Sequence, residues 1–118
     1  MSSTLPRIAV RTRNTNRNGA QFDERTINAV WNKAATVLGE SPNVRRMDVC
    51  GALIDRAQYG RTTEDGTGWE IDHIKPVSRG GTDDLSNLQS LQWQNNRKKG
   101  DQFPVVPAQY RAVSARKN

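Results

Sequence analysis

Hydrophobic side chains recur at helical spacing along residues 22–39. Five apolar residues share positions three or four apart on one face: Ile27, Val30, Trp31, Ala34 and Leu38. This spacing predicts a helix with one face packed against a core. Asp23 is placed to cap the first turn, and Gly39 is placed to end the helix. We therefore expect a single packing helix over this segment.

Apolar and polar residues alternate along a second segment, Trp69-Glu70-Ile71-Asp72-His73-Ile74. A period of two predicts a half-buried strand, with Glu70 as an acid on the strand surface. Asp72 and His73 are neighbours, so in a regular strand their side chains point to opposite faces. We expect the strand to end or bend there if both side chains are to reach one phosphate.

The segment that follows predicts a partner for this strand. Residues 88–91 read as a returning strand and residues 93–99 as a short helix, which Gly100 ends. Asn96 and Lys99 lie three positions apart and therefore on one face of that helix. One side of the helix can thus present an amide oxygen and a cation together.

Composition limits the class of protein. A chain of 118 residues with 34% hydrophobic residues forms one domain with tails. Its single cysteine excludes an intramolecular disulfide framework, which secreted domains of this size usually need. The sequence has neither the apolar core of a signal peptide nor a run near the ~20 apolar residues of a membrane span. We expect a cytoplasmic protein with no membrane partner.

Charge is distributed unevenly along the chain. Residues 1–22 carry a net charge of +4, residues 23–96 carry −3, and residues 97–118 carry +5. Basic ends around a mildly acidic centre suit a protein that binds a phosphate backbone with its tails and a cation at its centre. The alternative is that the basic tails only keep a small protein soluble.

The candidate chemistry gathers around the only histidine, His73. Asp72 precedes it, and the polar cluster Asn95-Asn96-Arg97-Lys98-Lys99 follows some twenty residues later. A carboxylate and an amide oxygen can share one hard cation, and an imidazole beside them can take a proton from water. These are the groups that a metal-dependent hydrolase requires.

Four short elements keep a fixed order along the chain: Asp72-His73, Gly80-Gly81, Asn87-Leu88 and Asn96-x-x-Lys99. This order resembles the HNH nuclease family, whose ββα-metal unit cuts nucleic-acid backbones. The resemblance covers residues 69–99, with weaker similarity back to about Met47. It implies a small α+β domain built on the ββα-metal (HNH, His-Me finger) unit, with the N-terminal helix packed against it.

The resemblance also assigns roles to four residues. The family's metal ligands match Asp72 and Asn96, and its general base matches His73. Its middle asparagine, which braces the loop that orients the base, matches Asn87. We expect this domain to span residues 22–103, between a flexible basic arm and a basic C-terminal tail, at residues 1–21 and 104–118.

Many HNH proteins also hold a structural zinc ion with two Cys-x-x-Cys pairs. Here those pairs read Met47-Asp48-Val49-Cys50 and Gln92-Trp93-Gln94-Asn95. One thiol cannot complete a four-ligand site, so we expect no structural zinc and packing of Trp69 and Trp93 in its place. Asn96 at the last ligand position, rather than His, favours one Mg²⁺ or Mn²⁺ ion in the active site.

The function that these features predict is a metal-dependent endonuclease acting on DNA, with RNA left open as a substrate. Six residues are expected to bind the nucleic acid: Arg11, Arg13, Arg17, Arg97, Lys98 and Lys99. One alternative is a catalytically silent DNA-binding module. Another is a nuclease toxin module, which would have an acidic immunity partner. A homodimer is left open, because one site cuts one strand at a time.

Overall fold

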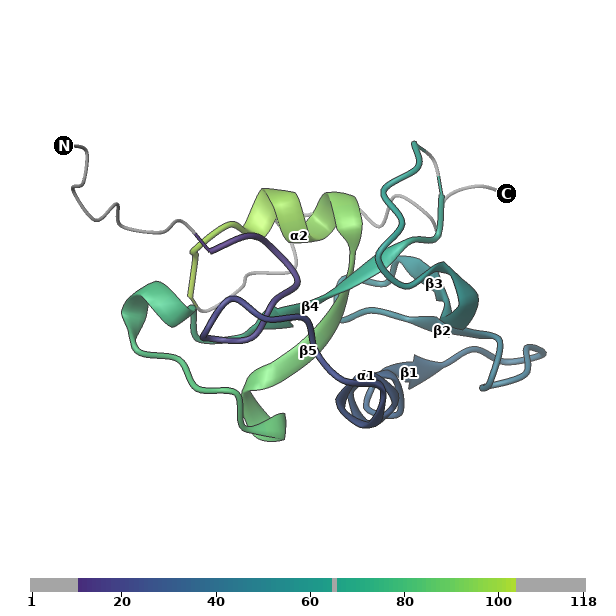
Figure 1. Ribbon diagram of the computed structural model, residues 1–118. Coiled ribbons are helices and arrows are strands. Elements are labelled where there is room, and N and C mark those ends of the chain that lie inside the picture. Colours follow the sequence, from purple (N-terminus) through teal and green to yellow (C-terminus); the bar gives the residue numbers. More distant parts are fainter. Residues whose placement is uncertain (1–10, 65, 104–118) are drawn as a thin grey trace, which may run out of the picture.

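The computed structural model describes residues 11–64 and 66–103 of the chain. The regular elements, in chain order, are α1 (Glu24–Trp31), β1 (Ala35–Thr36), β2 (Arg45–Met47), β3 (Leu53–Asp55), β4 (Trp69–His73), β5 (Leu88–Gln92) and α2 (Trp93–Lys99) (Figure 1). Short 3₁₀ turns lie at Arg56–Gln58, Val77–Arg79 and Leu85–Asn87. The first ten residues of the expected basic arm and the expected C-terminal tail lie outside the described residues. No helix in the described ranges is long and apolar enough to cross a membrane.

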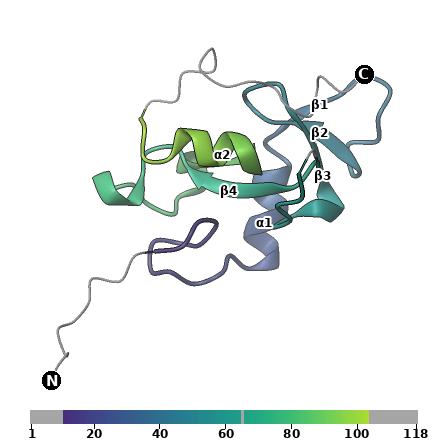
Figure 2. The same ribbon diagram turned by 90° about the horizontal axis from the view of Figure 1, so that it is seen from above.

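The strands form two antiparallel sheets. One has the order β1-β2-β3, and the other pairs β4 with β5 so that Trp69 lies opposite Gln92 and His73 opposite Leu88. The two helices cover opposite faces of the β4–β5 hairpin, with α2 following β5 directly (Figures 1 and 2). Two strands and the helix that follows them form a ββα unit, which confirms the expected α+β fold.

The hydrophobic core lies between α1 and the β4–β5 hairpin. Helix α1 contributes Ile27, Val30 and Trp31, and the indole of Trp31 lies 5.3 Å from that of Trp69 in β4. At the start of the helix the carboxylate of Asp23 accepts a hydrogen bond of 2.8 Å from the backbone N–H of Thr26. The predicted N-terminal cap of the packing helix is therefore confirmed.

The C-terminal half of that helix was predicted wrongly. The helix expected over residues 22–39 ends at Trp31, and Leu38 is fully exposed instead of packed. The guanidinium of Arg46 donates to the carbonyls of residues 32 and 34, at 3.2 and 3.0 Å. The chain then pairs with β2 as strand β1. Hydrogen bonds from the Arg46 side chain thus take the place of the backbone hydrogen bonds that would continue the helix. The spacing of apolar residues does not predict these tertiary hydrogen bonds.

Strand β4 ends at His73 as expected, but it is more deeply buried than its alternating pattern predicts. All five of its residues are buried, including Glu70 at 5% and Asp72 at 8% exposure. The apolar side chains face α1, and the two acids lie on the other face, where α2 packs. Glu70 is therefore not the strand-surface acid that the sequence suggested.

Residues 11–17, here called the N-terminal strap, run beside the edge of β4 that β5 leaves open (Figure 1). Asn14 adopts a left-handed backbone conformation with φ of 61°. Its Oδ1 accepts hydrogen bonds from the backbone N–H of Ile71 at 2.7 Å and from the hydroxyl of Tyr59 at 2.9 Å. Thr15 is buried. The described part of the expected flexible arm is thus held on the domain by specific contacts.

Candidate active site

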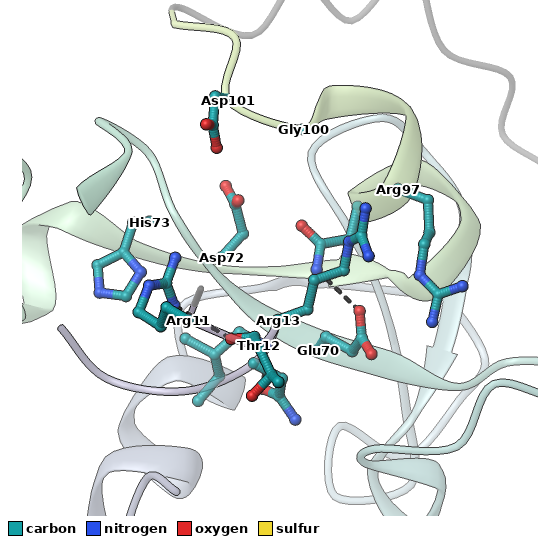
Figure 3. A pocket seen from close by; sticks show the side chains of 12 residues that line it. Arg11, Thr12, Arg13, Glu70, Asp72, His73, Arg97, Gly100 and Asp101 are labelled. Carbon is teal, nitrogen blue, oxygen red and sulfur yellow. Dashed lines mark hydrogen bonds between the residues drawn. The ribbon is translucent and has the colours of Figure 1, made fainter. Parts of the chain in front are cut away.

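An open pocket of about 660 Å³ lies where the strap, β4 and the end of α2 meet (Figure 3). Its lining comes from these three segments: Arg11, Thr12, Arg13 and Asn14; Glu70, Ile71, Asp72 and His73; and Asn96, Arg97, Gly100 and Asp101. The pocket has room for a sugar-phosphate unit together with water. It brings together Asp72, His73 and Asn96, the three residues expected to carry the chemistry.

The open edge of β4 explains how neighbouring residues reach one pocket. Asp72 and His73 lie on opposite faces of the strand, as a period of two requires. Both faces are accessible from the edge that does not pair with β5, and the pocket wraps around that edge. Of the two expected possibilities, an end or a bend, the structure has the first: the strand ends at His73, and its open edge gives both side chains access to the pocket.

Asp72 is held by two partners. Each of its carboxylate oxygens lies 3.2 Å from the ammonium of Lys99, and Oδ2 also accepts a 3.0 Å hydrogen bond from Gln89. Burial raises the pKa of Asp72, and the Lys99 ammonium and the Gln89 amide act against that rise. The carboxylate of Asp72 is therefore held in one orientation, and the small part of it that is exposed lines the pocket.

Asn96 is oriented by Glu70. Its Nδ2 donates a 2.8 Å hydrogen bond to Oε1 of Glu70, and an ionised carboxylate can only accept. The amide nitrogen must therefore face Glu70, which turns the Asn96 oxygen the other way. No described residue donates to that oxygen. Glu70 thus determines which end of the amide is offered to the pocket.

The oxygens of Asp72 and Asn96 suit a hard divalent cation. Mg²⁺ prefers oxygen donors and is commonly bound through one or two protein ligands with several waters. Among residues 11–64 and 66–103 no group of three or more His, Cys, Asp or Glu side chains is arranged to hold a metal. Two oxygen donors fit a hard divalent cation better than zinc, which favours nitrogen and sulfur ligands.

His73 is buried at 3% exposure and packs 6.0 Å from the ring of Phe22. Its Nε2 lies 2.7 Å from Oδ1 of Asp83. Figure 3 shows the imidazole at the same end of the pocket as Arg11, with one ring nitrogen turned toward the residues drawn and the other turned away. The histidine is thus oriented by a carboxylate whose role was not predicted from the sequence.

Asn87 closes the loop that joins β4 to β5. Its Oδ1 accepts from the backbone N–H of Lys75 at 2.8 Å, and its Nδ2 donates to the carbonyls of Lys75 and Thr82 at 3.1 and 2.8 Å. Gly81 allows this closure, because a Cβ there would fall 1.7 Å from the Lys75 carbonyl oxygen. Asn87 therefore contacts the loop backbone, as the resemblance implies, and makes no hydrogen bond to the imidazole itself.

The six expected nucleic-acid contacts fall into three groups. Arg11, Arg13 and Arg97 line the pocket. Arg17 and Lys98 are exposed but lie outside that lining. Lys99 differs from the expectation: it is 1% exposed, and its ammonium is engaged by Asp72 and, at 3.0 Å, by the carbonyl of His73. Its cation therefore faces the active-site carboxylate rather than solvent.

Sequence reasoning did not assign roles to three residues that hold the site: Glu70, Gln89 and Asp83. Two of them left a usable signal. Glu70 lies two positions before Asp72 and so on the same strand face, and Gln89 is the cross-strand neighbour of Asp72 in the hairpin register. Asp83 lies in a loop, where no periodicity indicates which way a side chain points.

Comparison with known proteins gives one family match. The family model described as HNH endonuclease matches residues 49–102. Residues 49–102 are an HNH endonuclease domain. No curated protein and no solved structure matches the chain. The matched range contains β4, β5, α2 and all four residues with assigned roles in the HNH motif.

At the positions of the zinc-binding pairs, this HNH domain has a buried hydrogen-bond cluster centred on Asp48. Oδ1 of Asp48 accepts from the backbone N–H groups of Cys50 and Ala52, at 2.9 and 2.8 Å. Oδ2 accepts from the backbone N–H of Gln92 and from Nδ2 of Asn95, at 2.9 and 3.1 Å. One carboxylate thus joins the turn before β3 to the first turn of α2.

This cluster corrects the expected role of the tryptophans. Trp69 is buried in the core, but Trp93 is only partly buried and stacks on the guanidinium of Arg97, 5.0 Å from the ring centre. The side chain of Gln92 continues the cluster, because its Oε1 caps α2 by accepting from the N–H of Gln94 at 2.8 Å. Polar groups, and not a pair of indoles, occupy the region where zinc pairs lie in other HNH proteins.

The thiol of Cys50 is expected to react slowly. Burial, reinforced by the nearby Asp48 carboxylate, raises the pKa of Cys50 to about 11 from an ordinary 9.0. The higher pKa lowers the fraction of thiolate at pH 8, but it also makes each thiolate a stronger nucleophile. Because the first effect is larger, labelling by an aromatic disulfide at pH 8 should be about tenfold slower than for a free cysteine peptide. The rate measured against pH should rise until about pH 11, and urea should abolish the difference. An inflection near pH 9 in the folded protein would contradict the burial of this thiol.

Proposed function

We propose that this HNH protein is a divalent-metal-dependent endonuclease that hydrolyses phosphodiester bonds in DNA. The observation that carries the proposal is one pocket lined by the Asp72 carboxylate, the Asn96 amide and the His73 imidazole. Arginines 11, 13 and 97 line the same pocket. Oxygen donors, a base and cations at one place are what hydrolysis of an anionic diester requires.

His73 is the general base of the proposed reaction. A neutral imidazole can accept a proton from water, and a positioned base contributes roughly 10² to 10⁴ in rate. Its burial against Phe22 and its contact with Asp83 restrict the ring to one direction. Asn87 supports this arrangement by holding the loop backbone between β4 and β5.

Asp72 and Asn96 would hold the cation. When bound there, a divalent ion supplies charge neutralisation at the phosphate and assists departure of the leaving oxygen. Lys99 aligns the Asp72 carboxylate from within the domain and favours its ionised form, and Glu70 turns the Asn96 oxygen toward the pocket. The two ligands are therefore each oriented by a buried partner, which keeps the site assembled before the ion arrives.

The basic residues of the pocket bind the nucleic acid. Arg11 is fixed by hydrogen bonds of 2.8 and 3.2 Å from its guanidinium to the carbonyl and hydroxyl of Thr15. Arg97 is held over the Trp93 ring. Arginines anchored in this way offer their remaining N–H groups to phosphates on either side of the cleaved bond.

Incubation of the pure protein with supercoiled plasmid and Mg²⁺ or Mn²⁺ tests the proposal. Nicked or linear DNA should appear, and a chelator should prevent it. The Asp72→Ala variant should lose at least tenfold in rate at low metal concentration, because metal-site partners contribute on this scale. Asp84→Ala, which removes an exposed carboxylate outside the pocket, should cleave normally.

Two other outcomes would count against the proposal. A protein that retards plasmid in a gel but leaves it uncut with either metal is a silent DNA-binding module. A protein that cuts single-stranded or structured RNA and spares DNA has the proposed chemistry with a different substrate. The same reaction series with a labelled RNA distinguishes these cases.

A further inference from the structure

The contact between His73 and Asp83 determines which nitrogen of the imidazole can act as a base. Nε2 lies 2.7 Å from Oδ1 of Asp83, and an ionised carboxylate offers only acceptors. The proton of the neutral ring must then reside on Nε2, which leaves the lone pair on Nδ1. No described residue hydrogen-bonds to Nδ1, and His73 lines the pocket.

We propose that Asp83 is the positioning residue of the catalytic histidine, and that Nδ1 of His73 is the atom that takes the proton from water. The role of Nδ1 as a base rests on the proposed function, whereas the contact between Asp83 and His73 does not. Asp83 itself touches no substrate in this scheme. It acts through the ring, by selecting one tautomer and by holding one nitrogen toward the pocket.

The side chain of Asp83 is held by the N-terminal strap. Both of its oxygens lie within hydrogen-bond distance of the backbone N–H of Arg17, at 3.0 and 3.2 Å. On its own loop, the preceding carbonyl of Thr82 is held by Asn87. The strap and the β4–β5 loop therefore meet at one carboxylate, which in turn holds the imidazole. Asn87 thus acts on His73 through this loop.

The proposed step conserves protons and charge. Water gives one proton to Nδ1 while its oxygen forms a bond to phosphorus, and the bond from phosphorus to the leaving oxygen breaks. The leaving alkoxide takes a proton from solvent, and the imidazolium later returns its proton to solvent. While the ring carries that extra proton, the Asp83 carboxylate forms an ion pair with it and so stabilises the charged form.

The presence of a single histidine allows a direct test. In the full-length protein labelled with ¹⁵N, a long-range ¹H–¹⁵N spectrum at a pH where the ring is neutral contains signals from His73 alone. We expect Nε2 to have the shift of a protonated nitrogen and Nδ1 that of an unprotonated one. In Asp83→Ala both shifts should move toward a mixture of tautomers, while Asp84→Ala should reproduce the wild-type spectrum.

Cleavage kinetics supply the second readout. Asp83→Ala should lower kcat roughly tenfold to a hundredfold, with KM for DNA within about twofold, because removal of a group that orients the base leaves substrate contacts intact. Asp83→Asn retains an oxygen that can accept from Nε2 and should recover part of the loss. Thermal unfolding of each variant checks that the fold is retained.

The outcomes separate this inference from the proposed function. A wild-type ring protonated on Nδ1, or shifts that Asp83→Ala leaves unchanged, would overturn the role of Asp83 whether or not the protein cuts DNA. Expected shifts in a protein that cuts no nucleic acid would support the positioning contact and remove the proposed function. A loss of DNA affinity in Asp83→Ala without a loss of kcat would also overturn it, since it would place Asp83 in substrate binding.

Discussion

The His73→Ala variant is expected to cut DNA roughly 10²- to 10⁴-fold more slowly than the wild type under single-turnover conditions, with DNA affinity within about twofold. The variant removes the base but neither of the proposed metal ligands, and the arginines that line the pocket remain. His73 is buried, and its ring packs against that of Phe22. Gel retardation and a single-turnover time course measure the two quantities.

Two comparisons sharpen this test. Added imidazole should restore part of the rate in His73→Ala, because the vacated space still has the Asp83 carboxylate to orient a small base. Raising the metal concentration should restore Asp72→Ala but not His73→Ala, since only the first variant is impaired in binding the ion. Cleavage by His73→Ala at the wild-type rate would show that water is activated without this residue.

The Asp48→Ala variant is expected to destabilise the protein by about 3–5 kcal/mol. Four N–H donors lose their acceptor at once, from Cys50, Ala52, Gln92 and Asn95. The carboxylate is 4% exposed, so water cannot replace it without opening the structure between β3 and α2. Urea unfolding followed by tryptophan fluorescence measures the loss, which is a large share of the 5–15 kcal/mol typical of a domain.

A matched control again comes from Asp84, whose replacement by alanine should change stability by less than about 0.5 kcal/mol because the residue is exposed. Asp48→Asn keeps one acceptor oxygen and should lie between the two. If Asp48→Ala unfolds at the wild-type urea concentration, the cluster does not replace the zinc site as a source of stability.

Local patterns predicted the ββα unit well. Strand β4, strand β5 and helix α2 were placed to within a residue, and Gly100 was correctly expected to end α2. These elements follow one another along the chain and pair with their immediate neighbours, so the signal for each is local. The end of α1 was missed because it depends on Arg46, which is remote in sequence and donates to the last carbonyls of that segment.

The same distinction between local and tertiary signals applies to the residues of the candidate site. The motif indicated Asp72, His73 and Asn96, which carry the proposed chemistry. It did not indicate what holds them, because those contacts depend on register and loop conformation. Lys99 is the clearest case: helical spacing placed it correctly on the face of Asn96, but spacing cannot tell whether a cation extends to solvent or turns inward to Asp72.

The open edge of β4 has a consequence for self-association. A two-stranded sheet offers an unpaired row of amides and carbonyls, to which an extended segment of another chain can add as a third strand. Asn14 occupies this edge by accepting from the Ile71 amide, and its left-handed conformation turns the backbone away instead of continuing as a pairing strand. Asn14, together with the Gly60 amide that donates to the Trp69 carbonyl at 2.8 Å on the same edge, therefore limits strand addition to the hairpin.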